Sequence, residues 1–146
     1  MFVPTLNYNG TSTFTWKGHD GTVYSSNTAT TTITINPVND APVISSFSLT
    51  GVEDTTITLA ANDFTTHFSD VENQTLASLR VLSLPSNGTL RLSTTPVTIN
   101  QVIPVASLNN LNFVPTADWN GTTTFSWEAT DGQLYSVASA IVTLVV

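Results

Sequence analysis

The side chains with the clearest chemical potential in this sequence are its carboxylates. The chain holds ten Asp and Glu residues against three Lys and Arg residues, which gives a formal net charge of -7. Carboxylate, Asn and carbonyl oxygens are hard ligands that suit Ca²⁺ at about six to eight coordination. Only Glu128 lies inside a clear strand, and the others fall in expected turns, linkers or strand ends: Asp20, Asp40, Glu53, Asp54, Asp63, Asp70, Glu72, Asp118 and Asp131. Carboxylates without basic partners indicate either solvated polar turns or bound cations.

Other site chemistries find little support. The chain has no cysteine, which removes disulfides and thiolate metal sites. His19 and His67 are far apart in sequence and lack the short spacing of zinc ligands, so we expect both to be solvated loop residues. Asp70 and Glu72 could be imagined as a general acid and base. Because no nucleophile motif, phosphate loop or set of cleft residues accompanies them, we do not expect an enzyme.

Composition narrows the partners and the setting. The acidic balance repels phosphate backbones and anionic membranes, so nucleic acid is not an expected partner. No apolar run approaches the roughly 20 residues that a membrane-spanning helix needs, so membrane insertion is not expected. Hydrophobic residues make up 40% of the chain and charged residues 9%, which favours a folded chain with a substantial core.

The elements that position these acids belong to a duplicated segment. Residues 2–35 and 113–146 align at a displacement of 111 positions with 16 identical residues. A repeat of this length is a domain with its own core rather than a solenoid unit. We therefore expect residues 1–36 to be the C-terminal half of a preceding repeat, and residues 37–146 to be one complete repeat that includes the linker 36–43.

The duplicated segment alternates as half-buried strands do. Between Thr122 and Thr130, the residues Phe125, Trp127 and Ala129 share one face, and Ala140, Val142, Leu144 and Val146 share a face of the closing strand. Phe14 and Trp16 repeat this pattern in the first copy, so we expect both tryptophans to be buried. Further strands are expected at 43–49, 55–60, 76–84, 88–92, 98–102 and 108–113. About seven short strands separated by turns predict an all-β, Greek-key β-sandwich.

The order of motifs along the chain resembles the bacterial cadherin-like repeats of large tandem-repeat, RTX-type surface adhesins. The likeness covers essentially the whole sequence. It rests on Pro37-Val38-Asn39-Asp40-Ala41-Pro42-Val43, Glu53-Asp54-Thr55, Asp70-Val71-Glu72-Asn73, Pro85-Ser86-Asn87-Gly88-Thr89-Leu90, Val114-Pro115, Asp118-Trp119-Asn120-Gly121-Thr122 and Thr130-Asp131-Gly132. It implies an extracellular protein, surface-attached or secreted, whose Ca²⁺-stiffened repeats extend a binding module away from the cell.

The resemblance also implies how the calcium ligands are divided between the ends of a repeat. The leading-end set matches Asn39, Asp40, Asp70, Glu72 and Asp131, and the trailing-end set matches Glu53, Asp118 and Asn120. At the junction, Asn7 and Asn9 of the first copy would join the cluster around Asp40. Since Asn7 replaces the carboxylate of Asp118, we expect the junction site to be weaker than a complete one, or empty.

Two alternatives remain open at this stage. The aromatic residues could stack on a glycan, with Tyr8 and Trp119 as the expected exposed rings, which would make the chain a carbohydrate-binding cadherin-like module of a secreted, polysaccharide-acting protein. The half-repeat could be disordered, could add strands to the complete domain, or could exchange with a second chain in a homodimer. Neighbouring repeats of the same chain are the expected partners in the adhesin interpretation.

Overall fold

The computed structural model describes residues 1–146, which form two compact units, Met1–Val38 and Asn39–Val146. We call them unit 1 and unit 2. The sequence-based boundary at residue 36 lies close to this division. Neither helix of the structure has the length and hydropathy that crossing a membrane would require.

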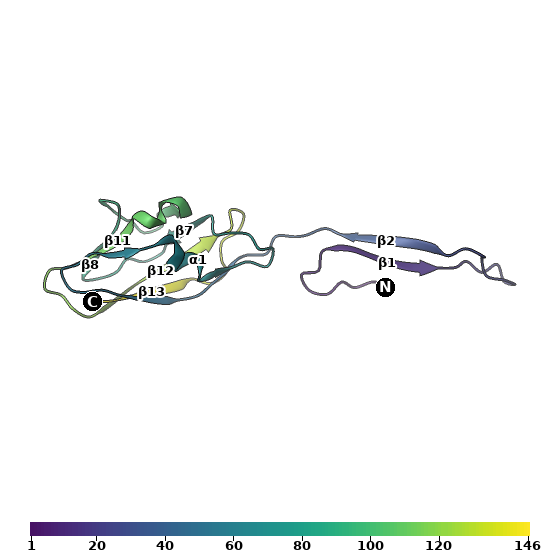
Figure 1. Cartoon of the computed structure of the whole chain (residues 1–146), viewed down its shortest axis with the longest axis horizontal. Helices are drawn as coiled ribbons and strands as arrows, with labels where there is room; N and C mark the ends of the chain where they lie inside the picture. Colours follow the sequence, from purple (N-terminus) through teal and green to yellow (C-terminus); the bar gives the residue numbers. More distant parts are fainter. The chain divides into compact units, whose positions relative to one another are not determined.

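Unit 1 is built around one antiparallel pair of strands, β1 (Gly10–Trp16) and β2 (Ala29–Ile35), drawn in purple and blue in Figure 1. Their register runs from Gly10 opposite Ile35 to Trp16 opposite Ala29. The side chains of Phe14 and Trp16 are about half exposed. The expectation that Trp16 is buried is therefore wrong, because burial of a strand face requires a second layer, and this unit has a single two-stranded sheet.

Unit 2 is a β-sandwich, which confirms the all-β prediction. Its elements in chain order are β3 (Val43–Ile44), β4 (Phe47–Thr50), β5 (Ile57–Leu59), α1 (Ala61–Thr65), β6 (Phe68–Ser69), β7 (Ser78–Val81), β8 (Gly88–Leu92), β9 (Thr95–Pro96), β10 (Val102–Pro104), the 3-10 helix η1 (Val105–Asn110), β11 (Leu111–Pro115), β12 (Thr122–Thr130) and β13 (Ala140–Val145). One sheet has the order β10-β7-β12-β13-β4, the other has the order β5-β11-β8-β9, and β3 pairs with β6.

The core of unit 2 lies between these sheets. Phe125, Trp127 and Ala129 of β12 are buried as their alternation predicts, and so are Ala140, Val142 and Leu144 of β13. The Trp127 ring meets the Phe64 ring of α1 edge to face, with ring centres 5.1 Å apart. Such aromatic pairs add stability beyond the area that they bury.

Unit 1 repeats the last hairpin of unit 2 in register as well as in sequence. In unit 2, Thr122 lies opposite Val145 and Trp127 lies opposite Ala140. A displacement of 111 positions converts these pairs into Thr11 opposite Thr34 and Trp16 opposite Ala29. Isolated bridges next to the hairpins, His19 with Tyr24 and Thr130 with Tyr135, match in the same way.

Several strand expectations need correction. Residues 98–101 form a turn in which Gln101 N–H donates to the carbonyl of Thr98, so the strand begins only at Val102. Residues 108–110 belong to η1 rather than to a strand. The expected strand 43–49 is divided in two because β3 pairs with β6 whereas β4 pairs with β13 in the five-stranded sheet.

Candidate calcium-binding ends

The predicted leading-end residues are linked to one another in unit 2 by short hydrogen bonds. Asn39 Nδ2 donates to Asp131 Oδ2 at 2.8 Å. The Asp40 N–H donates to Glu72 Oε2 at 3.1 Å, and the Glu72 N–H donates to Asp70 Oδ1 at 2.9 Å. The structure thus joins the start of unit 2 to the loop after β6 and to the turn after β12.

Asp131 is held by its own turn. Its Oδ1 accepts hydrogen bonds from the N–H groups of Gln133 at 2.6 Å and Leu134 at 2.8 Å. Partial desolvation acts to raise the pKa of Asp131, but the hydrogen bonds from Asn39, Leu134 and Gln133 outweigh it, and the pKa lies below its ordinary value. The carboxylate is therefore kept ionised.

Asp70 presents the one carboxylate oxygen in this cluster that is both buried and unsatisfied. Its Oδ1 accepts from the N–H groups of Glu72 and Gln74, whereas its Oδ2 is inaccessible to solvent and has no hydrogen-bond partner. A buried carboxylate oxygen without a donor is costly, and a bound cation is one of the few groups that can satisfy it.

Two glutamines that were not among the predicted ligands complete the cluster. Gln74 Nε2 donates to Asn39 Oδ1 at 2.6 Å, and Gln133 Nε2 approaches the same oxygen at 3.3 Å. Each glutamine follows an acidic turn residue, four positions after Asp70 and two after Asp131. That proximity is the signal that could have identified them, because such turns bring nearby side chains into the same cluster.

The donor set fits a hard cation, although it does not close around one by itself. No three His, Asp or Glu side chains of the structure come together closely enough to hold a metal ion. The cluster offers carboxylate, amide and backbone oxygens with no soft ligand among them, which suits Ca²⁺ rather than Zn²⁺. By the chemistry of these donors, and by the unpartnered oxygen of Asp70, the residues present fit calcium.

The predicted trailing-end set is less well gathered. The Asp118 N–H donates to a carboxylate, but the acceptor is Asp54 Oδ1 at 2.9 Å rather than Glu53. Glu53 and Asn120 are exposed, and neither side chain makes a hydrogen bond in the structure. The backbones of Asp54 and Asp118 are both left-handed, with φ of 59° and 56°. Short polar residues tolerate this conformation, so turn geometry alone accounts for part of the acidic pattern.

Unit 1 contains the equivalents of both turns, but only one of them keeps its acid. Asn7, the equivalent of Asp118, has φ of 60°, and Asp20 Oδ1 accepts from the N–H groups of Val23 and Thr22, both at 2.8 Å. These two hydrogen bonds lower the pKa of Asp20. Asn7 and Asn9 belong to unit 1 and Asp40 belongs to unit 2, so the predicted junction site stays a prediction.

The remaining candidate residues are the histidines and the aromatic residues expected to be exposed. His67 is not a solvated loop residue, because its ring stacks on the Phe47 ring with the ring centres 4.7 Å apart, and its Nδ1 lies 2.7 Å from the Asp63 carbonyl oxygen.

Trp119 is half-buried, and its ring packs over Gly121, where a Cβ would lie 3.0 Å from Trp119 Cζ2. Tyr8 is partly exposed and donates to the Thr11 carbonyl. Glycan binding by Tyr8 or Trp119 stays a prediction.

Comparison with known proteins places this fold and these loops in a family. A family model described as a cadherin-like domain matches residues 38–146. No curated protein and no solved structure matches the chain significantly. Cadherin-like domains are in general non-enzymatic, generally bind calcium and are associated with extracellular adhesion. Since the match spans most of the sequence and coincides with the sandwich of unit 2, the chain belongs to the cadherin-like domain family.

Proposed function

We propose that this chain is an extender segment of a bacterial cell-surface adhesin, and that the leading end of its cadherin-like domain binds Ca²⁺. The family supports an extracellular adhesion role. The internal duplication supports a tandem array, in which repeats provide length rather than chemistry.

One observation carries the calcium proposal. Asp70 Oδ2 is buried and unpartnered in a cluster of oxygen donors that also includes Glu72, Asp131 and the first two residues of unit 2. At neutral pH these carboxylates repel one another. Several of the hydrogen bonds that they accept come from amide groups, which carry no positive charge to offset the repulsion. A divalent cation would supply the missing positive charge.

Two groups of residues in this chain would hold the ion. Asp70, Glu72 and Asp131 would hold the ion from two loops of the sandwich, and Asn39 and Asp40 would hold it from the segment that enters unit 2. Because no three of the acids lie close enough to hold an ion in the structure, binding would draw them together. Pro37 and Pro42 flank that segment, and each fixes its own φ near -65°. The ion would therefore fasten an already stiff connector to the domain that follows.

Thermal unfolding of the 146-residue chain in calcium and in chelator tests this function. A ligand that binds only the native state stabilises it by about 2.7 kcal/mol when its free concentration is 100 times Kd. We expect the midpoint of unit 2 to rise on addition of CaCl₂ and to return on addition of EGTA. A midpoint that is the same in both solutions would remove the calcium proposal and leave the fold unaffected.

A further inference from the structure

The sheet of unit 1 has an apolar face whose equivalent is buried in the core of unit 2, but no second layer covers it in unit 1. Phe14 is 52% exposed and Trp16 is 51% exposed, whereas their equivalents Phe125 and Trp127 are 1% and 0% exposed. Phe2 is 46% exposed and its equivalent Phe113 is fully buried. Since the strand register is the same in the two copies and Phe2, Phe14 and Trp16 have identical equivalents, the difference lies in what covers the face.

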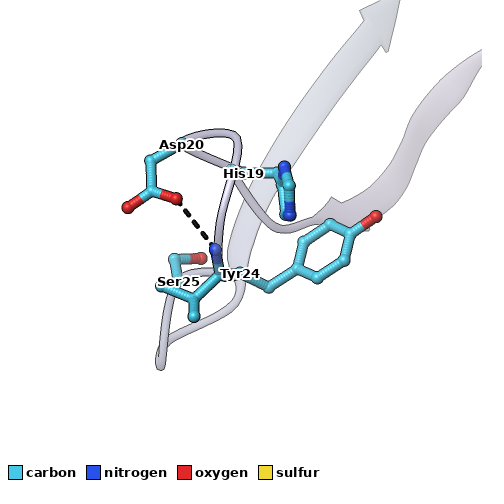
Figure 2. A pocket seen from close by; sticks show the side chains of 6 residues that line it. His19, Asp20, Tyr24 and Ser25 are labelled. Carbon is cyan, nitrogen blue, oxygen red and sulfur yellow. Dashed lines mark hydrogen bonds between the residues drawn. The ribbon is translucent and has the colours of Figure 1, made fainter.

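The first hollow of unit 1 corresponds to the place of strand β7 in unit 2. It has a volume of about 390 Å³ and is lined by Gly18, His19, Asp20, Val23, Tyr24 and Ser25. Figure 2 shows the His19 ring beside the Tyr24 ring, with the Asp20 carboxylate hydrogen-bonded at the other side of the turn. In unit 2, the Ala77 N–H donates to the carbonyl of Thr130, the equivalent of His19. Arg80 Cζ lies 4.4 Å from the ring centre of Tyr135, the equivalent of Tyr24.

The second hollow corresponds to the place of the turn that leads into β8. It has a volume of about 220 Å³ and is lined by Phe2, Val3, Pro4, Thr5, Tyr8 and Ser12. In unit 2, the Thr116 N–H, equivalent to that of Thr5, donates to the Asn87 carbonyl at 3.0 Å. Ser86 Oγ lies 3.2 Å from Thr123 Oγ1, whose equivalent is Ser12. Both hollows are thus places that the front part of unit 2 fills.

The strand edges of unit 1 give the same indication. In unit 2, β12 pairs with β7 and β13 pairs with β4 in addition to each other. In unit 1, β1 and β2 form a sheet of two strands only. Open strand edges are templates for pairing, and an isolated two-stranded hairpin is marginally stable in water.

We propose that the apolar face of unit 1 is the docking surface for the front part of another cadherin-like repeat, a segment of the same class as residues 39–112, which closes a second sandwich. The occupant would supply a strand beside β1, a strand beside β2 and the opposite sheet. It would also carry a glycine opposite Phe2, because a Cβ at Gly88 would lie 2.3 Å from Phe113 Cζ.

Residues 39–112 of the same chain cannot take this role for unit 1. The surface of residues 39–112 that would have to cover unit 1 is already covered by β12 and β13. Moreover, Asn39 bonds Asp131 at one end of β12, whereas Val146 bonds Gly121 at the other end. These ends are ten residue steps apart, about 33 Å along an extended strand, and Ile35 and Asn39 are separated by four steps, at most about 14 Å.

Exchange of hairpins between two copies of the chain does not cover the apolar face either. If the hairpin of unit 1 replaced residues 113–146 of a second copy, the displaced hairpin would expose the same apolar face. The number of uncovered hairpins would stay constant, so an exchanged dimer gains no burial. A separate front segment is the occupant that removes the exposed face.

A lengthened chain tests this proposal. A second copy of residues 39–112 is placed directly before Phe2, which occupies the position that Phe113 has after Asn112. The fluorescence of Trp16 is isolated by subtracting the spectrum of the Trp16→Phe variant from that of the unsubstituted chain. This is done for the original and for the lengthened protein. We expect the Trp16 emission to shift to shorter wavelength and its quenching by acrylamide to fall at least about fivefold.

The matched control is Gly88→Val in the inserted copy alone, which should block packing on Phe2 and keep Trp16 quenchable. If Trp16 stays as quenchable in the lengthened chain as in the original, or if the insert remains unfolded while unit 2 melts normally, the proposal is wrong. Light scattering of the original chain provides a further check. A dimer with a protected Trp16 would identify a second copy as the occupant and overturn the proposal, whereas a monomer with a quenchable Trp16 agrees with it.

Discussion

Replacing Asp70 by asparagine should change the stability of unit 2 in opposite directions with and without calcium. The amide of Asp70→Asn has nearly the same shape as the carboxylate, and its Oδ1 can still accept from the N–H groups of Glu72 and Gln74. The charge is lost, and a neutral NH2 group takes the position of the buried Oδ2 atom. The substitution thus tests the unpartnered oxygen without removing the loop that holds it.

The expected magnitudes follow from that oxygen. An unsatisfied buried polar group costs about 1–3 kcal/mol, and more when it is charged. In chelator, Asp70→Asn should therefore be neutral or stabilising by up to about 1 kcal/mol. In calcium at 100 times Kd, the native chain gains about 2.7 kcal/mol. At about 4 °C per kcal/mol for a domain of roughly 100 residues, this gain is an increase of about 11 °C, most of which the variant should lack.

Calorimetric melting of both chains in EGTA and in CaCl₂ provides the four midpoints that are needed. Asp20→Asn is a matched control, because Asp20 lies in unit 1 and belongs to neither of the ligand sets predicted for unit 2. If Asp70→Asn destabilises the chain equally in both solutions, Asp70 serves only its loop and the reasoning from its buried oxygen is refuted. An undiminished calcium response in the variant would refute it as well.

Two further predictions concern acid and packing. Because the folded-state pKa of Asp131 lies below its ordinary value of 3.8, its contribution is complete above the unfolded pKa and is lost as pH falls through the folded pKa. Urea midpoints in chelator should fall between pH 5 and pH 3, and less steeply for Asp131→Asn; equal slopes would contradict this. Gly88→Ala should destabilise unit 2 by about 1–3 kcal/mol, since its Cβ would lie 2.7 Å from the Val114 carbonyl oxygen as well as against Phe113. Gly18→Ala, with nothing within 4 Å, is the control, and equal urea midpoints for the two variants would refute the packing argument.

The part of the fold that could be predicted from sequence is the part that local patterns determine. Alternation placed the buried face of β12 on Phe125 and Trp127, and both side chains are buried. The elements that were missed depend on distant partners. The chain divides between β3 and β4 because Ser45 bonds His67 and because the Ser46 hydroxyl accepts from Ile141 N–H, and no period within residues 43–49 contains that information.

Trp16 and Trp127 show the same limit for burial. Their strands are similar in sequence and share their register, yet one ring is half exposed and the other is buried. A pattern identifies which face of a strand is apolar, whereas burial depends on a second layer from elsewhere in the chain. For the site, charge drew attention to Asp70 and Asp131 but not to Gln74 and Gln133, because neutral amides have no distinctive composition signal in a chain rich in turn residues.

The hydrogen bonds at the start of unit 2 make it possible to distinguish two effects that calcium could have. Asn39 and Asp40 already bond Asp131 and Glu72, so they move with the sandwich, and residues 36–38 remain as the connector after β2. An ion held by unit 2 alone would therefore stabilise that domain against heat without restraining what precedes Asn36. Stiffening of the array requires a ligand from before the connector, and Asn7 and Asn9 are the predicted source. A calcium response in melting thus tests the leading-end site, whereas its dependence on Asn7 tests the junction, and the first can be present without the second.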